Sequence, residues 1–133
     1  MKYKAAAYLR LSKEEFSNEK ESNSITNQKL IIDNYLKEHK EYELVDYYID
    51  DGYSGTNFNR PAFQKMIKDI ELGKVNMVVT KDLSRLGRDY IETGEYIEKW
   101  FPENNIRYVS VTDGIDTFEA SNGNNDIAPF KSI

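Results

Sequence analysis

The 133-residue chain contains no cysteine, so disulfide bonds and thiolate metal sites are excluded. It has a single histidine, which stands in Glu38-His39-Lys40 near the end of a predicted helix. We expect this side chain to be exposed and to take no part in chemistry. A chain without thiols is compatible with a reducing compartment, and we expect a cytoplasmic location.

Long hydrophobic runs are also absent. The apolar stretch near the N-terminus covers only Ala5 to Leu9, and Arg10 and the charged residues 13–15 follow it. This stretch is too short and too charged for a signal peptide. No run approaches the length that a membrane span requires. We therefore expect no association with a membrane.

An excess of basic residues is the third absence. The 18 Lys and Arg are outnumbered by 23 Asp and Glu, which gives a formal net charge of −5. A free-standing DNA-binding domain is usually basic, because neutralisation of phosphates supplies most non-specific affinity. If this chain acts on DNA, most of the affinity must come from another domain or from oligomerisation.

The length is that of one domain with its own core. Predicted strands cover residues 4–9, 44–49, 77–80 and 106–111. Predicted helices start after Ser24, at Pro61 and after Asp89, where a capping residue or proline precedes an apolar stripe. Strands that alternate with helices predict an α/β fold, with a mostly parallel sheet of about four or five strands and helices on both faces.

The remaining segments are predicted to be loops. Residues 13–23 are charged and polar, and we expect them to form a mobile loop. Residues 50–59 are rich in Gly, Asp and Asn and form a second loop. Residues 1–112 are then the folded domain, and residues 113–133, which include an Asn- and Gly-rich run, are a flexible segment.

Polar side chains follow three of the predicted strands. Because the carboxyl ends of parallel strands meet at one edge of a sheet, these side chains should converge. Arginine can grip a phosphate through two parallel hydrogen bonds, and a helix N-terminus favours anions. A serine beside several arginines suggests chemistry on a phosphodiester. The candidates are Arg10 and Ser12 after the first strand, Asp51, Ser54 and Arg60 after the second, and Arg85 and Arg88 after the third.

These residues fall in motifs that resemble the catalytic domain of serine recombinases, the resolvase–invertase family, over residues 3–113. The motifs are Tyr8-Leu9-Arg10-Leu11-Ser12, Gln28 early in the first helix, Asp51-Gly52-Tyr53-Ser54-Gly55 with Arg60-Pro61, and Ser84-Arg85-Leu86-Gly87-Arg88. The sequence of residues 81–88 is most similar to that of the large serine recombinases of transposons and phages. The chain departs from small resolvases at Ser84, where they more often have Asp, and it has Asn76 at a position where many relatives have Asp.

The resemblance implies a site-specific recombinase with a resolvase-like fold. Ser12 would attack a DNA phosphodiester to give a 5′-phosphoserine intermediate, followed by strand exchange and religation. Arg10, Arg85 and Arg88 would hold the phosphate, and supporting roles would fall to Tyr8, Gln28, Asp51, Ser54 and Arg60. Neither a metal nor another cofactor is implied.

The partners implied are double-stranded DNA and further copies of the chain. DNA would be held through domains that this chain lacks, and the full-length protein would form a homodimer to homotetramer. Residues 113–133 would lead toward a missing oligomerisation helix and DNA-binding domains.

Two alternatives remain open from the residues. The chain could be a non-catalytic α/β oligomerisation domain, in which case Arg10, Arg85 and Arg88 would be dispensable. It could also be a metal-dependent nuclease that uses Asp50, Asp51 and Asp82.

Overall fold

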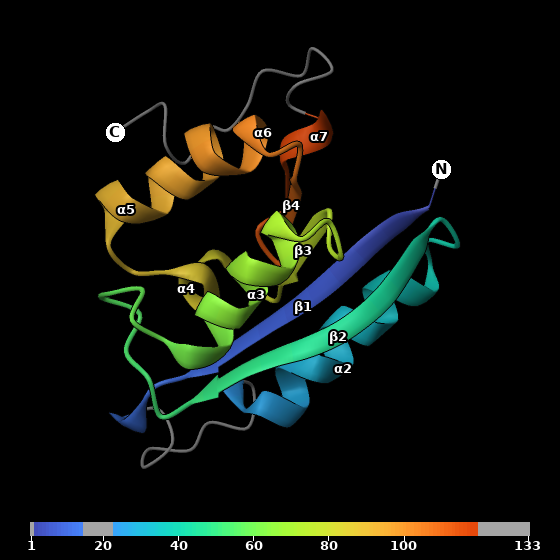
Figure 1. Cartoon of the computed structure of the whole chain (residues 1–133). Helices are drawn as coiled ribbons and strands as arrows, with labels where there is room; N and C mark the ends of the chain where they lie inside the picture. The colour runs from blue at the N-terminus through green and yellow to red at the C-terminus, as the bar shows by residue number, and fades with distance from the viewer. Residues whose placement is uncertain (1, 15–22, 120–133) are drawn as a thin grey trace.

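The fold is a five-stranded sheet with helices on both faces, seen in a computed structural model that describes residues 2–14 and 23–119 (Figure 1). The strand order is β2-β1-β3-β4-β5. The strands are β1 (Tyr3–Leu11), β2 (Tyr42–Asp51), β3 (Met77–Thr80), β4 (Arg107–Ser110) and β5 (Ile115–Asp116). The first four are parallel, and β5 is antiparallel to β4. The predicted fold class is confirmed.

Helix α2 (Ile25–Lys37) covers one face of the sheet, and the other large helices cover the opposite face (Figure 1). The second face carries α3 (Pro61–Glu71) and the short α4 (Leu83–Leu86). A continuous helical segment follows, made of α5 (Tyr90–Glu95), the π-helix η2 (Tyr96–Trp100) and α6 (Phe101–Glu103). A last helical turn, α7 (Thr117–Glu119), follows β5.

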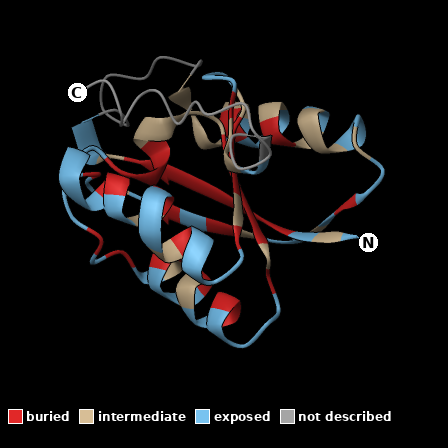
Figure 2. Ribbon diagram, turned by 90° about the horizontal axis from the view of Figure 1, so that it is seen from above, coloured by how far each residue is buried: buried red, intermediate tan, exposed pale blue. Residues whose placement is uncertain are grey.

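Strand β1 is an interior strand between β2 and β3, as its small apolar residues suggest, although the middle strand of the five is β3. Successive side chains of a strand point to opposite faces of the sheet. Accordingly, Ala5, Ala7 and Leu9 belong to the cluster under α2, whereas Ala6 and Tyr8 belong to the cluster under α3. All five side chains are fully buried. Figure 2 shows the buried strands between helices whose outer faces are exposed.

The predicted helix starts are confirmed by their caps. The Ser24 hydroxyl accepts a hydrogen bond of 3.0 Å from a backbone N–H in the first turn of α2. The Asp89 carboxylate accepts bonds of 3.0 and 3.1 Å from two N–H groups at the start of α5. Pro61 is the first residue of α3, where its missing N–H would have had no helical partner.

The order of the strands fixes where a site can form. From β1 the chain passes through α2 to β2 on one side, and then through α3 to β3 on the other side of β1. Because parallel crossovers are right-handed, this reversal puts α2 and α3 on opposite faces. The carboxyl ends of β1 and β3 therefore form a topological switch point, where α/β proteins bind their ligands.

Two of the differences from the predicted elements concern arginines. Strand β1 continues past Arg10, which therefore lies inside the strand, because the ladder to β2 extends to its end. The segment between β3 and the helix that starts after Asp89, where the sequence predicted no helix, also contains one. Helix α4 is a separate element of four residues that contains Arg85, whereas Arg88 lies between α4 and α5. Gly87 separates the two helices, since glycine is a poor helix former.

Beyond residue 113, β5 and α7 are elements that the sequence pattern did not predict. Most of the predicted mobile loop and most of the predicted C-terminal flexible segment, residues 15–22 and 120–133, lie outside the described residues.

Candidate active site

A buried arginine of strand β1 reaches the carboxyl end of α4. The Arg10 side chain is 0% exposed. Its Nη2 donates to the Ser84 carbonyl at 2.7 Å, its Nε to the Arg85 carbonyl at 3.3 Å and its Nη1 to the Tyr53 carbonyl at 2.9 Å. The last carbonyls of a helix have no partners within the helix, and Arg10 supplies donors for two of them. Arg10 thus connects β1, α4 and the loop after β2.

Arg60 is a second connection of the same kind. Its Nη2 donates to the Leu86 carbonyl at 2.6 Å, and its Nη1 donates to the Tyr8 hydroxyl at 2.9 Å and the Arg85 carbonyl at 3.3 Å. The guanidinium is 4.5 Å from the centre of the Phe58 ring. A helix of four residues is not stable alone, so two buried arginines hold α4 in place.

Arg85 points back from α4 to β1. Its Nη1 donates to the Arg10 carbonyl at 2.8 Å, which ties α4 to the strand shortly before Ser12. Its Nε and Nη2 donate to the Ser84 hydroxyl at 3.2 and 3.0 Å. The same hydroxyl donates to the Asp82 carboxylate. Arg85 is 3% exposed, and its guanidinium is held on two sides.

Arg88 is the exposed member of the three predicted phosphate-binding arginines. Its backbone N–H donates to the Gly55 carbonyl at 2.7 Å. A Cβ atom on Gly55 would lie 2.8 Å from Arg10 Nη2 and 2.9 Å from Arg88 Cγ, so a larger residue would not fit without a shift. A hollow of about 210 Å³, lined by Ser84, Arg88 and Tyr90 among others, opens beside this segment.

Ser12 directly follows β1 and is partly exposed. The backbone before it is held from two directions. The buried Gln28 side chain donates to the Arg10 carbonyl at 2.9 Å and accepts from the Arg10 N–H at 3.3 Å. The Leu11 carbonyl accepts bonds of 2.6 and 3.1 Å from two N–H groups of the loop after β2. Gln28 therefore acts on the backbone that presents Ser12.

The buried carboxylate of this region belongs to Asp50, which the sequence suggested only as a possible metal ligand and not as a supporting residue of the recombinase site. Asp50 is 2% exposed, accepts from the Tyr8 hydroxyl at 2.8 Å, and accepts from two backbone N–H groups of α3 at 2.9 Å each. The predicted residues Asp51 and Ser54 are exposed, and Ser54 contacts Thr56 at 2.8 Å in a local turn. The period-two pattern of β2, which puts Asp50 on the inward face with Tyr48, was a signal that could have identified it.

Tyr8 lies between Asp50 and Arg60 and remains a neutral phenol near neutral pH. Burial raises the pKa of Tyr8 above its ordinary value, and the nearby Asp50 charge also raises it, whereas the Arg60 charge opposes the shift. The hydroxyl can therefore donate to Asp50 while it accepts from Arg60. These contacts couple β1, β2 and α3.

The metal-dependent alternative finds no support in the geometry. Within residues 2–14 and 23–119, no group of three or more His, Asp or Glu side chains could hold a metal ion. Asp50 is committed to Tyr8 and α3, and Asp82 to Ser84.

Among the described helices, none has the length and apolar character needed to cross a bilayer.

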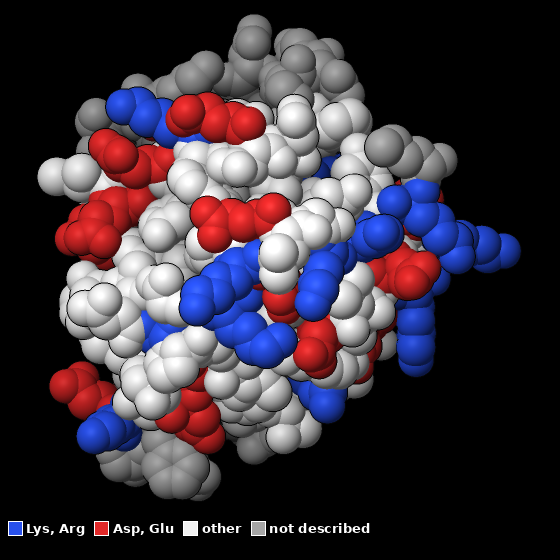
Figure 3. Space-filling model, in the orientation of Figure 1, with Lys and Arg blue, Asp and Glu red and all other residues white. Residues whose placement is uncertain are grey.

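The charge on the face shown in Figure 3 agrees with the lack of an excess of basic residues in the sequence. Figure 3 shows Lys and Arg side chains near the middle of one face, over the region of α3, with Asp and Glu side chains close by on several sides. Opposite charges that alternate in this way do not form a continuous basic surface for a DNA duplex.

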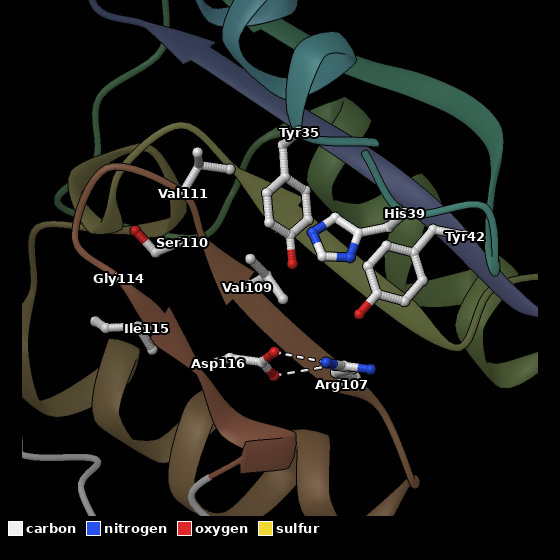
Figure 4. A pocket seen from close by; sticks show the side chains of 10 residues that line it. All are labelled: Tyr35, His39, Tyr42, Arg107, Val109, Ser110, Val111, Gly114, Ile115 and Asp116. Carbon is white, nitrogen blue, oxygen red and sulfur yellow. Dashed lines mark hydrogen bonds and ion pairs between the residues drawn. The ribbon is translucent and has the colours of Figure 1, made fainter. Parts of the chain in front are cut away.

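A second hollow, of about 220 Å³, lies on the α2 side, away from this site (Figure 4). The rings of Tyr35, His39 and Tyr42 lie together along it. The centre of the His39 ring is 4.5 Å from that of Tyr35 and 4.7 Å from that of Tyr42. At its edge, Arg107 and Asp116 pair through hydrogen bonds of 3.0 and 2.6 Å. His39, expected to be an exposed side chain, is instead a half-buried packing residue.

Comparisons with known proteins identify the family. A family model described as the resolvase N-terminal domain matches residues 5–127. The N-terminal catalytic domain of TP901-1 integrase is 31% identical, with a TM-score of 0.77 over 89% of this chain and 84% of that chain. A resolvase family site-specific recombinase from Streptococcus pneumoniae is 27% identical, with a TM-score of 0.73 over 98% and 83%.

A third solved structure is the C-terminal catalytic domain of ISC1926 TnpA, an IS607-like serine recombinase. It is 30% identical, with a TM-score of 0.65 over 81% of this chain and 67% of that chain. A search of curated proteins gave no match. The resemblance read from the motifs is confirmed: the chain belongs to the resolvase N-terminal domain family and is the catalytic domain of a site-specific serine recombinase.

Proposed function

We propose that Ser12 is the nucleophile of this recombinase domain. Its hydroxyl oxygen attacks a DNA phosphorus, the bond from phosphorus to the 3′-oxygen breaks, and a 5′-phosphoserine forms while the 3′-oxygen takes up a proton. In the reverse step, the 3′-hydroxyl of a partner strand attacks the phosphoserine and releases Ser12. The phosphodiester energy is conserved in the covalent intermediate, so the reaction needs no high-energy cofactor.

The observation that carries this proposal is the convergence of three arginines on the end of β1. The Arg10 carbonyl, two positions before Ser12 in the chain, is bound by Arg85, and the segment that carries Arg88 is tied to Gly55 over the Arg10 guanidinium. Fixed positive charge near a phosphorus stabilises the charge that develops as it becomes five-coordinate. Arg88 is exposed and is positioned to meet an incoming phosphate first.

The remaining predicted residues have positioning roles in this proposal. Tyr8 and Arg60 hold α4 and the strand end, and Gln28 holds the backbone before Ser12. Asp51 and Ser54 lie on the exposed side of the same edge, where the DNA backbone would approach.

We also propose that the domain acts as a homodimer to homotetramer on double-stranded DNA. Cleavage and exchange of two duplexes involves four strands, hence four nucleophiles. The formal charge of −5 and the mixed surface support a division in which DNA-binding domains after residues 113–133 supply most of the affinity.

The test is formation of a covalent protein–DNA adduct by the full-length protein. Its recombination sites are first mapped by sequencing DNA that stays attached to the protein in detergent, and are then placed on a supercoiled plasmid. We expect Ser12→Ala to abolish the adduct and cleavage with the fold intact. Ser24→Asn is the matched control, because asparagine keeps the N-cap of α2. An adduct that persists in Ser12→Ala contradicts the assignment.

The two alternatives are tested in the same assay. Loss of wild-type cleavage in chelator would support a metal-dependent nuclease. Full cleavage by Arg88→Ala would support the other alternative, a non-catalytic oligomerisation domain whose arginines are dispensable.

A further inference from the structure

Asp82 stands at the N-cap position of α4 but does not cap it. An aspartate at this position normally accepts a hydrogen bond from an N–H of the first turn, which is worth about 1 kcal/mol. Here the first N–H of α4, that of Leu83, is bound instead by the Asp113 carboxylate at 2.7 Å. Asp113 comes from the turn between β4 and β5. The first N–H of α4 therefore has a side-chain acceptor from elsewhere in the chain, while the Asp82 carboxylate accepts from none of the N–H groups of α4.

The Asp82 carboxylate is directed instead at Ser84 and Arg85. It accepts the Ser84 hydroxyl proton, and the same oxygen is 3.4 Å from Arg85 Nε. Because the Ser84 proton is committed to Asp82, the lone pairs of that hydroxyl face Arg85. They accept from Nε at 3.2 Å and from Nη2 at 3.0 Å.

This chain of contacts fixes the plane of the Arg85 guanidinium. The hydroxyl holds one edge, and the Arg10 carbonyl holds Nη1 at 2.8 Å. Without Asp82, the Ser84 hydroxyl would be able to rotate and point its proton at the guanidinium. Because both groups are then donors, no hydrogen bond would form between them. An arginine that grips a phosphate through two parallel bonds depends on the direction of its plane.

We propose that Asp82 acts through Ser84 as a positioning residue for Arg85 in phosphodiester cleavage. This inference rests on the proposed function, since it assigns Arg85 to the reacting phosphate. It adds a carboxylate and a hydroxyl, both acting through Arg85, to the residues that determine the rate.

The experiment measures single-turnover adduct formation by the full-length protein at saturating and sub-saturating plasmid concentration. We expect Asp82→Ala and Ser84→Ala each to lower the rate at saturation by about 100-fold, the size of effect that a displaced catalytic group produces. The half-saturating DNA concentration should stay within about twofold of wild type, because Asp82 and Ser84 are proposed to orient Arg85 and not to bind DNA. Asp89→Asn is the matched control, since it removes a nearby carboxylate charge and keeps the cap of α5.

Two further variants test the route of the effect. Asp82→Asn keeps an oxygen acceptor and should recover to within about tenfold of wild type, and Ser84→Thr keeps the hydroxyl and should do the same. The double variant Asp82→Ala/Ser84→Ala should be no more than about threefold slower than Ser84→Ala, because groups that act in series are not additive. A double variant that shows the product of the two single losses overturns the proposal. So does Asp82→Ala at the wild-type rate, or Asp82→Asn as slow as Asp82→Ala.

A measurement without DNA separates this inference from the proposed function. In the 133-residue chain, the Nε–H proton of Arg85 should exchange with solvent at least about tenfold faster in Ser84→Ala and Asp82→Ala than in wild type. Unchanged exchange overturns the positioning role. A wild-type protein that forms no adduct, or an adduct that survives Ser12→Ala, would instead count against the proposed function and leave the exchange result standing.

Discussion

Replacing Arg60 by lysine should weaken the attachment of α4 to the rest of the domain. Arg10, Arg85 and Arg88 all remain in this variant. Arg60 donates four hydrogen bonds, to the carbonyls of Asn57, Arg85 and Leu86 and to the Tyr8 hydroxyl. At about 1 kcal/mol net for each bond, the set contributes about 4 kcal/mol. Lysine has one nitrogen in place of a planar fork and can keep about half of the bonds. We therefore expect a loss of about 2 kcal/mol in the free energy of unfolding, in a domain whose total is of the order of 5–15 kcal/mol.

The loss is measured by urea denaturation. The single tryptophan, Trp100, is a suitable fluorescence probe, because it packs beside Phe101 in the core on the α3 side. The midpoint should fall with an unchanged slope, since the surface exposed on unfolding stays the same. Amide exchange should report the same change locally, at the Gly87 N–H that bonds to the Leu83 carbonyl at 3.2 Å.

Lys68→Ala is the control. Lys68 is an exposed cation on the same helix, α3, and its removal should change stability by no more than about 0.5 kcal/mol. If Arg60→Lys unfolds within about 0.5 kcal/mol of wild type, the reasoning that two buried arginines hold α4 is wrong.

Three further predictions follow from individual contacts. Gly55→Ala should destabilise the chain by about 1–3 kcal/mol and slow cleavage, because its Cβ would lie 2.8 Å from Arg10 Nη2; thermal melting and the adduct assay measure both effects. The Tyr48 hydroxyl and Lys65 hold the pKa of Asp69 below its ordinary 3.8. This carboxylate therefore stabilises the fold above about pH 4, and the stabilisation is lost as the pH falls through the lower pKa of the folded state. Tyr48→Phe should raise the pKa of Asp69 in an NMR titration and flatten the acid dependence of stability, and an unchanged pKa would refute the link to the Tyr48 hydrogen bond at 2.7 Å. The isolated 133-residue chain should bind duplex DNA weakly at physiological salt, so tight binding in a fluorescence anisotropy titration would contradict the inference from the charge of −5.

The four parallel strands and the helix starts were predictable because their signals are local. The run Met77–Thr80 and the caps at Ser24 and Asp89 depend on residues a few positions apart, and the structure has all three where the sequence predicts them. The convergence of Arg10 with Arg85 was predictable for a topological reason, since parallel strands end at one edge.

The direction of each arginine was not predictable, because it depends on partners distant in sequence. Arg10 is directed at carbonyls 43, 74 and 75 positions away. Arg60, which could have been only a residue that sets a turn before Pro61, reaches carbonyls up to 26 positions away. No spacing within a motif shows that a short helix has unpaired carbonyls at its end, or which buried donors satisfy them.

The contacts of Arg10 limit how the site can work. Its guanidinium is 0% exposed, and Nε, Nη1 and Nη2 all donate to backbone carbonyls. A phosphate that binds Arg10 must therefore displace the segment that contains Tyr53 and Gly55, or compete with the α4 carbonyls. Each carbonyl left without a donor in a buried site costs about 1–3 kcal/mol.

Arg88 can meet a phosphate without such a rearrangement, because it is already exposed. Gly55 lies so close to Arg10 that a Cβ atom on it would be 2.8 Å from Arg10 Nη2, and its carbonyl accepts from the Arg88 N–H at 2.7 Å. A phosphate that moves Arg88 would therefore also act on the segment that covers Arg10. If the arginines bind the phosphate as proposed, these contacts predict an order of engagement: Arg88 first, then the Tyr53–Gly55 segment, then Arg10. Under the same proposal, this acidic domain would complete its site only when the proposed DNA-binding domains deliver the phosphate to Arg88.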